Sequence, residues 1–473
     1  MPESKSVSDN ITLHVFEWHN QAYLFCGESM LIARIPKSFA TAVRADIRSR
    51  RDLTASCESA GVGRGLAELE EMGFFKPQLS NDDLGGLLQQ RNAFVDGREL
   101  VVLQLVISGS CNLSCRYCYA NQGAFNNKDA PAFMSLRTVR QAAELFFAHS
   151  AKGTFVHLLG GEPLLHPQLL SAVDTIVHES AKASRQVALS ATTNGTVLNG
   201  QIIVMLRKHS VRVSVSLDGP AEVHDMQRPT SSGRGSFAKA MEHLGQLWSE
   251  LGPEFVSVRV TCTPYNLPFL RAFLHELRSA FRDIRVEFSP VVLPSGLPLS
   301  LSRSNVDEFV SLQRELFNEE LTRLNDPRLR RDEALQKLEH NRIYNRQPLL
   351  AKCEIGMNLI TVAPNGFIYP CVGLLQDDTY AMGTVAQGGL SCPVSVISLY
   401  RQNNVVTRTG CQQCWAKYIC AGGCVAASRA VAGKELSTDA TMCTLYQSAA
   451  EMALLSCVVK CERPQFNTLT GIC

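Results

Sequence analysis

The sequence predicts an α/β fold: a partial (β/α)6 TIM-like barrel with a small N-terminal α+β domain and a C-terminal cysteine-rich domain. Three observations predict this class. Apolar runs of strand length alternate with amphipathic helical segments from about residue 100 to 288, as in βα units around a parallel sheet. The first 95 residues lack clustered cysteines, and beyond residue 350 glycine, proline and cysteine replace apolar periodicity.

The length of 473 residues exceeds what one core usually supports, so we expect several domains. The composition, 45% hydrophobic and 19% charged, is that of a globular chain. We place the boundaries after the changes in pattern, at residues 1–95, 96–300, 301–349 and 350–473.

The net charge of +2 gives no basic footprint for nucleic acid or an anionic membrane. No apolar run reaches the roughly 18 residues of a membrane helix, and the first residues lack the apolar stretch of a signal peptide. We therefore expect a cytoplasmic protein without nucleic-acid or membrane partners.

The N-terminal module combines strand and helix signals. Residues 11–18 and 21–25 are rich in β-branched and aromatic side chains, which is typical of strands. Helices are expected at 39–51 and 65–72. This order predicts a winged-helix-like module.

The barrel begins with a predicted strand at 99–107. The first helix is expected at 135–148, with Ser135 as its N-cap. Further strands are expected at 154–159, 186–193, 211–217, 254–262 and 284–288. Further helices are expected at 167–183, 200–208, 237–251 and 267–281. About six units fit this length, and charged amphipathic helices at 305–345 link the barrel to the cysteine-rich part.

Seventeen cysteines are the most unusual feature of the composition. A cytoplasmic protein keeps its thiols reduced, so closely spaced cysteines indicate metal or iron–sulfur ligands rather than disulfides.

The first cysteine cluster is the CxxxCxxC segment of Cys111, Cys115 and Cys118, directly after the first barrel strand. Barrel enzymes place their chemistry at this end of the strands. Three thiolates hold three irons of a four-iron cluster and leave the fourth iron open to a small ligand. A zinc knuckle is the alternative, but structural zinc normally takes four ligands and this loop offers three.

With Tyr117 before the last cysteine, this segment resembles the signature of the radical SAM superfamily. The resemblance implies a 4Fe–4S cluster and S-adenosyl-L-methionine (SAM). Gly160, Gly161, Glu162 and Pro163 resemble the family's GGEP element, in which the carboxylate binds the methionyl amino group.

Later strand ends extend the resemblance. It implies hydrogen bonds from Asn194, a role for Ser216 on the ribose or carboxylate side, and pairing of Arg228 with a carboxylate. Asp218, beside Gly219, is equally well explained as a turn residue.

Seven cysteines form the second array, and Asn365-Gly366 predicts a hairpin turn within residues 362–371. The array resembles the SPASM domain of peptide-modifying radical SAM enzymes. The resemblance implies two auxiliary clusters. Cluster I would be held by Cys353, Cys371 and Cys424, and cluster II by Cys411, Cys414, Cys420 and Cys443.

Cluster I is then one protein ligand short. Cys392 could complete it; otherwise one iron is open to solvent or substrate. A pair of zinc ribbons is the alternative, although seven cysteines cannot complete two four-ligand sites. The cysteines outside the clusters are expected to be buried hydrophobes or surface thiols, with metal binding possible for the last three; they are Cys26, Cys57, Cys262, Cys392, Cys457, Cys461 and Cys473.

The resemblance implies an oxidoreductase that generates a 5′-deoxyadenosyl radical, so we name no acid–base catalytic residue. It is closest to maturases that install thioether or carbon-linked crosslinks in ribosomally made peptides (RiPPs) or small proteins. A reductase, flavodoxin or ferredoxin-like protein would supply electrons. The 1–95 module could capture a leader peptide by strand addition, or serve as a packing or dimerisation cap.

Two other functions stay open. One is an anaerobic sulfatase-type enzyme that generates formylglycine. The other, from a different class, is a non-catalytic metal-binding or electron-transfer scaffold.

Overall fold

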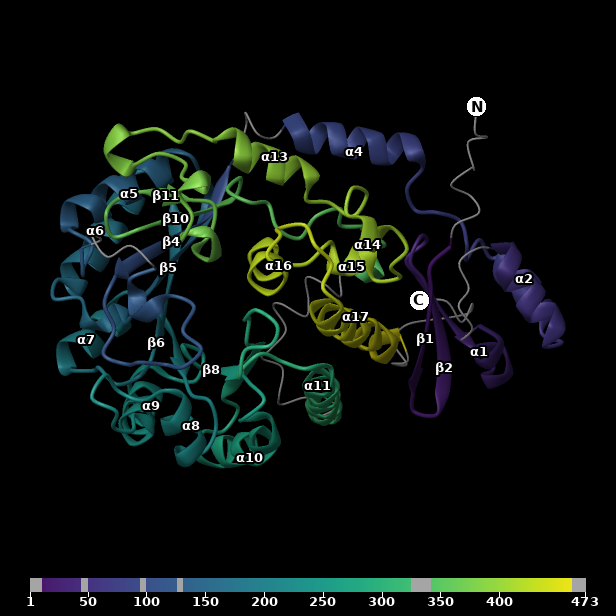
Figure 1. Ribbon diagram of the computed structural model, residues 1–473, viewed down its shortest axis with the longest axis horizontal. Helices are drawn as coiled ribbons and strands as arrows, with labels where there is room; N and C mark the ends of the chain where they lie inside the picture. The colour runs from purple at the N-terminus through teal and green to yellow at the C-terminus, as the bar shows by residue number, and fades with distance from the viewer. Residues whose placement is uncertain (1–10, 44–49, 94–98, 126–130, 325–341, 462–473) are drawn as a thin grey trace.

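The computed structural model describes residues 11–43, 50–93, 99–125, 131–324 and 342–461 (Figure 1). A curved sheet with its helices forms one side of the molecule. The cysteine-rich segments lie beside it, and the N-terminal module lies beyond them (Figure 1).

The central sheet has eight strands in the order β11-β10-β4-β5-β6-β7-β8-β9. The six barrel strands are all parallel, which confirms the predicted partial barrel. They are β4 (Leu100–Ser108), β5 (Ser150–Gly160), β6 (Gln186–Thr193), β7 (Arg212–Ser216), β8 (Val256–Cys262) and β9 (Arg285–Pro290).

The predicted hairpin consists of β10 (Leu359–Val362) and β11 (Ile368–Tyr369), joined by a turn with Gly366 at φ +86°. Its strand β10 pairs in parallel with β4, from Leu359 opposite Val102 onward. The cysteine-rich part therefore extends the barrel sheet, which the sequence did not predict. The barrel core likewise includes side chains of the hairpin. The domain boundaries inferred from the sequence remain proposals.

Helices cover the outer face of the sheet (Figure 1). Ser135 caps the first by accepting a hydrogen bond from the Thr138 amide at 3.0 Å, as predicted. The short helix α8 was not predicted. These helices are α5 (Leu136–Ala148), α6 (Leu169–Lys182), α7 (Gly200–Lys208), α8 (Ala221–Gln227), α9 (Phe237–Leu251) and α10 (Leu270–Ala280). The 3-10 turns of this part are η2 (Asn121–Gly123), η3 (Pro163–Leu165) and η4 (Leu267–Phe269).

The two faces of the barrel strands differ in polarity because successive side chains point to opposite faces. Val156 and Leu158 of β5 belong to the core beneath the helices. His157 lies between them on the opposite, inner face, in register with Gln104 of β4 and Ser190 of β6. The inner face of the sheet therefore carries a polar row.

The N-terminal module has an antiparallel sheet in the order β1-β2-β3, of which β3 was not predicted. Within the range 39–51, where one helix was expected, the described residues belong to α1, which ends at Val43, and to α2, which begins at Arg50; residues 44–49 lie outside the described part. Helix α4 was also missed because it lacks an apolar stripe. The elements are β1 (Leu13–Trp18), β2 (Gln21–Cys26), β3 (Leu31–Ile35), α1 (Lys37–Val43), α2 (Arg50–Ser59), α3 (Gly63–Glu71) and α4 (Asn81–Ala93).

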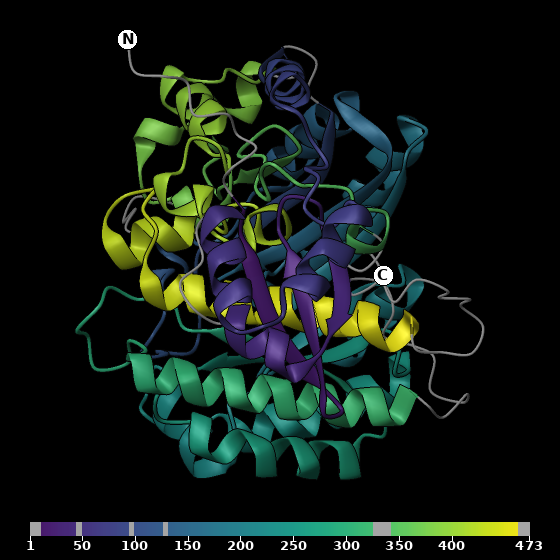
Figure 2. The ribbon, with the colours of Figure 1, turned by 90° about the vertical axis from the view of Figure 1, so that its right-hand side faces the viewer.

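This small sheet is buried on both faces. One face packs under α1 to α3. The other packs against α17 and α15 of the cysteine-rich part, and Figure 2 shows its strands in front of α17. The module is therefore docked on the C-terminal part of the chain.

The prediction of little regular structure beyond residue 350 is wrong for the end of the described chain, where α17 (Ala440–Cys461) is a long helix. Residues 440–459 form a helix that, by its length and composition alone, could cross a membrane. The sequence analysis did not predict such a helix. Leu454 and Val458 pack against the N-terminal module, which is the environment of a core helix.

The other elements of this half are shorter, apart from the expected linker helix α11. They are α11 (Arg303–Leu324), η5 (Val372–Leu374), η6 (Asp378–Tyr380), η7 (Val385–Gln387), α13 (Val394–Gln402), α14 (Thr409–Gln412), α15 (Lys417–Cys420) and α16 (Val425–Ala432).

Candidate active site

The loop after β4 brings the first three cysteines together. The charge of Cys115 contributes to raising the pKa of Cys111, and the charge of Cys118 contributes to raising the pKa of Cys115. Burial raises the pKa of Cys111 to about 11. Because iron binds thiolates, a cluster would have to displace these protons. The donor set fits a cluster held by three thiolates.

Backbone amides and an asparagine already point at these sulfurs. Cys111 Sγ accepts from the Leu113 amide at 3.4 Å and from Asn194 Nδ2 at 3.7 Å. Cys118 Sγ accepts from the Gln122 amide at 3.3 Å. Donors to sulfur stabilise negative charge there, as a thiolate ligand requires.

The two glycines at the end of β5, Gly160 and Gly161, allow close contact between backbone segments. A Cβ at Gly160 would lie 2.1 Å from the Ser108 carbonyl oxygen, and one at Gly161 would lie 2.2 Å from that of Ser110. The Gly161 amide donates to Ser108 O at 2.8 Å. Both glycines therefore let the end of the strand lie directly against the cysteine loop.

Glu162 is fully buried at the end of β5 and is fixed by three donors. Its Oε1 accepts from Thr193 Oγ1 at 2.7 Å and from the Leu164 amide at 3.0 Å, and its Oε2 accepts from the Asn194 amide at 2.6 Å. Burial raises the pKa of this carboxyl to about 6, although the donors favour its charged form. A cationic ligand group would offset the desolvation. Pro163 follows as the first residue of η3.

A second buried network joins Tyr117, Asp218 and Arg228. The Tyr117 hydroxyl donates to Asp218 Oδ2 and accepts from Arg228 Nη1. Arg228 Nη1 lies 3.6 Å from Asp218 Oδ2. Inside the protein Arg228 therefore pairs with Asp218, and its contact with SAM stays a prediction.

Asp218 has a larger role than that of a turn residue. It is fully buried, and its Oδ1 accepts from the Thr261 amide at 3.0 Å. The neighbouring Ser216 is nearly buried at the end of β7, opposite Arg259 of β8. Asn194 also donates to Asn112 Oδ1 at 2.9 Å, which ties the end of β6 to the cysteine loop.

Three inner-face residues were missed by sequence reasoning: Tyr119, His157 and Arg259. His157 Nδ1 lies 2.8 Å from Ser190 Oγ, and its Nε2 lies 3.1 Å from Thr192 Oγ1. Burial, with a smaller effect of the Arg259 charge, lowers the pKa of His157 to about 4, so this imidazole is neutral at pH 7.

Tyr119 lies between the two cysteine arrays. The residue is 55% exposed. Desolvation by neighbouring protein atoms, with smaller contributions from the thiols of Cys118 and Cys371, raises the pKa of Tyr119 to about 12, and the charge of Arg259 opposes this rise. The signal that could have identified Arg259 and His157 is a polar residue at alternate positions of an apolar strand.

Among the C-terminal cysteines, electrostatic effects on the thiol pKa values link members of each of the two predicted sets. Cys371 is influenced by Cys353 and Cys424, and burial raises its pKa to about 12. In the second set, the charges of Cys411 and Cys414 contribute to raising the pKa of Cys420. The same two thiols contribute to raising the pKa of Cys443. Iron ligation by these sets remains a prediction.

Within the described residues, no three His, Cys, Asp or Glu side chains converge at the spacing of ligands to one metal ion.

The cysteines outside the sets have different positions. Cys26, Cys57, Cys262 and Cys457 are buried, and Cys392 is partly buried just before α13. Cys461 ends α17, and Cys473 lies outside the described residues. Metal binding by the last three cysteines stays untested.

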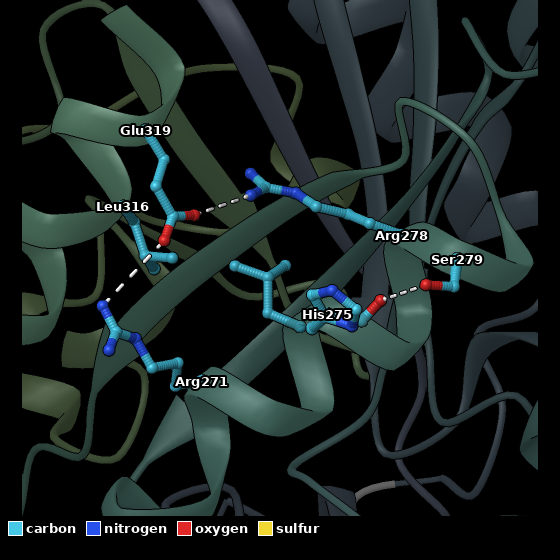
Figure 3. Close-up of a pocket in the computed structure, with 7 residues that line it drawn as sticks. Arg271, His275, Arg278, Ser279, Leu316 and Glu319 are labelled. Carbon is cyan, nitrogen blue, oxygen red and sulfur yellow. Dashed lines mark hydrogen bonds and ion pairs between the residues drawn. The ribbon is translucent and has the colours of Figure 1, made fainter. Parts of the chain in front are cut away.

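A separate surface cavity of about 280 Å³ lies between α10 and α11 (Figure 3). Both arginines of its lining form ion pairs. Arg271 Nη2 lies 2.6 Å from Glu315 Oε2, and Arg278 Nη1 lies 3.7 Å from Glu319 Oε2. These ion pairs leave no unpaired charge in the cavity lining to attract a ligand.

A comparison with protein families finds a match over the part of the chain that carries the first cysteine cluster and the strand ends around it. The family model of the radical SAM superfamily matches residues 105–258, from β4 to β8. The chain contains a radical SAM domain. The predicted radical SAM enzyme is thereby confirmed, and this family implies a 4Fe–4S cluster and SAM.

Two curated relatives extend beyond the radical SAM domain. The chain is 21% identical to the radical SAM cyclopropyl synthase TigE of Paramaledivibacter caminithermalis over 75% of this chain and 74% of TigE. It is 23% identical to a serine-type anaerobic sulfatase-maturating enzyme of Klebsiella aerogenes, over 71% and 82% of the two chains.

Solved structures share the fold of this radical SAM enzyme. The enzyme anSMEcpe with bound AdoMet has a TM-score of 0.60 and 17% identity, covering 76% of this chain and 98% of its own. SuiB of Streptococcus suis bound to S-adenosylmethionine has a TM-score of 0.53 and 13% identity, covering 92% and 99%. SuiB was also solved with its precursor peptide SuiA, which matches with a TM-score of 0.50 and 12% identity over 91% and 98% of the chains.

Proposed function

We propose that this radical SAM enzyme modifies a ribosomally made peptide or small protein and installs an intramolecular thioether or carbon-linked crosslink. The observation that carries the proposal is the grouping of the seven C-terminal cysteines into sets of three and four. The set of three lies near the cysteine loop that follows β4, because the thiols of both Cys118 and Cys371 raise the pKa of Tyr119.

The residues of the site have distinct tasks in this proposal. Cys111, Cys115 and Cys118 would hold the SAM-binding cluster. Glu162, fixed by its three donors, would accept hydrogen bonds from the SAM ammonium. When bound, the cluster and SAM supply a 5′-deoxyadenosyl radical that abstracts hydrogen.

The inner face of the barrel would position the substrate. Neutral His157 and cationic Arg259 occupy this face, and Arg259 Nη2 donates to Ser289 Oγ at 3.3 Å. These polar groups would orient a peptide backbone between the SAM loop and auxiliary cluster I. The two auxiliary clusters would accept the electron released as the new bond forms.

The N-terminal module would capture part of the peptide. Its sheet ends at β3, which pairs only with β2 among the described strands. An extended peptide can add to such an edge through main-chain hydrogen bonds. The solved complex of SuiB with SuiA supports a peptide substrate. A cytoplasmic location and a flavodoxin- or ferredoxin-like donor complete the proposal.

The first test uses the full chain, reconstituted with iron and sulfide without oxygen. With reductant, SAM and a short peptide encoded beside its gene, we expect 5′-deoxyadenosine and a loss of about two hydrogens per crosslink. The variant Cys115→Ala should form neither product while it keeps most auxiliary iron. Absence of SAM cleavage by the wild-type chain would refute the proposal.

Formylglycine formation is the second candidate, because sulfatase-maturating enzymes are among the relatives and share the fold. A peptide aldehyde trapped by a hydrazide would select it, whereas a crosslinked fragment would select the crosslinking function. Metal analysis separates both from a scaffold: three full clusters predict about twelve irons per chain, and a scaffold predicts zinc.

A further inference from the structure

Arg91, near the end of α4, connects the N-terminal module to α13. Its side chain is 9% exposed, and its Cζ lies 3.8 Å from the centre of the Tyr400 ring. Arg91 Nη1 donates to the Tyr400 carbonyl, and the Tyr400 hydroxyl donates to the Arg91 carbonyl at 3.0 Å. The guanidinium is therefore held in one place.

Two of its nitrogens lack a hydrogen-bond acceptor. Arg91 Nε and Nη2 are buried and have no such partner within the described residues. Nη2 lies 3.4 Å from Glu354 Oε2, close enough for an ion pair but without a hydrogen bond. Leaving charged N–H groups unsatisfied inside a protein is costly. An acceptor other than these protein atoms is expected beside Arg91.

The guanidinium lies near one cysteine of the set of three, because Glu354, whose Oε2 lies 3.4 Å from Arg91 Nη2, directly follows Cys353 in the chain. Burial raises the pKa of Cys353 to about 11, and the positive charge of Arg91 acts in the opposite direction. Cys353 in turn acts on Cys371. The sulfurs of a cluster bound by this set would be acceptors of the kind that Arg91 lacks.

We propose that Arg91 donates N–H hydrogen bonds to sulfur atoms of auxiliary cluster I and raises the reduction potential of that cluster. This rests on the proposed function, which assigns Cys353, Cys371 and Cys424 as its ligands. Hydrogen bonds and positive charge near the sulfurs favour the more negatively charged, reduced state. In this role Arg91 adjusts the potential of the cluster and takes no part in bond making, and the N-terminal module supplies it.

The test compares Arg91→Gln and Arg91→Lys in the full, reconstituted chain. All variants carry Cys115→Ala, which removes the signal of the SAM cluster, and the auxiliary clusters are titrated by EPR spectroscopy. We expect a more negative potential for cluster I in Arg91→Gln and a smaller shift in Arg91→Lys. The potential of cluster II should not change.

Arg401→Gln is the matched control, because it removes the same charge from an exposed position on α13. It should leave both potentials unchanged. An Arg91→Gln chain with wild-type iron content and wild-type potential would overturn the proposal, even if its melting temperature fell. If Arg91→Gln fails to fold, an unshifted potential in Arg91→Lys has the same consequence. A parent chain without cluster I iron would instead overturn the ligand assignment.

Discussion

At the scale of single residues, burial gives the site its chemical character. Asp218 illustrates this, since a sequence with Asp-Gly favours a turn, whereas the folded chain surrounds the carboxylate with Tyr117, Arg228 and the Thr261 amide. Glu162 is the second case: three donors hold a carboxyl whose pKa burial raises to about 6. The local sequence gives the type of each residue, but it does not show how deeply the folded chain buries its side chain.

The raised pKa of Glu162 predicts how SAM binding depends on pH. The ammonium group of SAM favours an ionised carboxylate, so affinity should strengthen as pH rises through about 6. Without ligand the sign for folding is opposite: the stability contributed by the protonated carboxyl is full below its ordinary value near 4.5 and is lost as pH rises through about 6.

Equilibrium binding of SAM to the cluster-loaded enzyme at pH 5.5 and 7.5 checks this prediction. Glu162→Gln should weaken binding about 10- to 100-fold, the cost of a hydrogen bond to a charged group, and should flatten the pH dependence. A variant with the same pH profile as the wild type would show that Glu162 does not contact the ammonium.

At the scale of elements, the site depends on backbone contact between consecutive strand ends. The end of β5 lies so close to the cysteine loop after β4 that no side chain fits at Gly161. The β10-β11 hairpin adds a further contact by pairing with β4 on its other side. The loop with the first cysteines is thus held between two elements that come from distant parts of the chain.

Gly161→Ala should disturb this loop, because its Cβ would meet the Ser110 carbonyl oxygen at 2.2 Å. We expect a loss of about 1–3 kcal/mol in the free energy of unfolding and a loss of SAM-cluster iron, with auxiliary iron retained. Gly153→Ala is the control, since nothing lies within 4 Å of its Cβ on the same strand. Equal iron content in the two variants would contradict this reading of the glycine.

At the scale of the whole molecule, the N-terminal module and the loop of the proposed cluster II form one interface. Trp415, which follows Cys414, stacks on His14 with ring centres 3.8 Å apart. Lys417 Nζ lies 2.8 Å from Glu28 Oε1, and both side chains are largely buried. The module that we propose to capture peptide therefore contacts the segment between two proposed cluster ligands.

Glu28→Gln should destabilise this interface, because it leaves Lys417 buried without its counter-charge. We expect a loss of about 3–5 kcal/mol in stability and faster loss of cluster II iron during dilution into chelator. Glu68→Gln, at an exposed ion pair with Arg64, should change neither quantity. Retention of cluster II iron at the wild-type rate would argue against coupling between module and cluster.

The sequence by itself determined the six barrel strands and the position of the first three cysteines after the first of them, because these depend on periodicity and spacing along the chain. Tertiary structure decided the rest. It placed the β10-β11 hairpin beside β4, gathered Tyr119, His157 and Arg259 on the inner face, and buried Arg91 near Cys353. These positions come from packing between segments far apart in the chain, and local sequence patterns carry no record of which distant surface a side chain will meet.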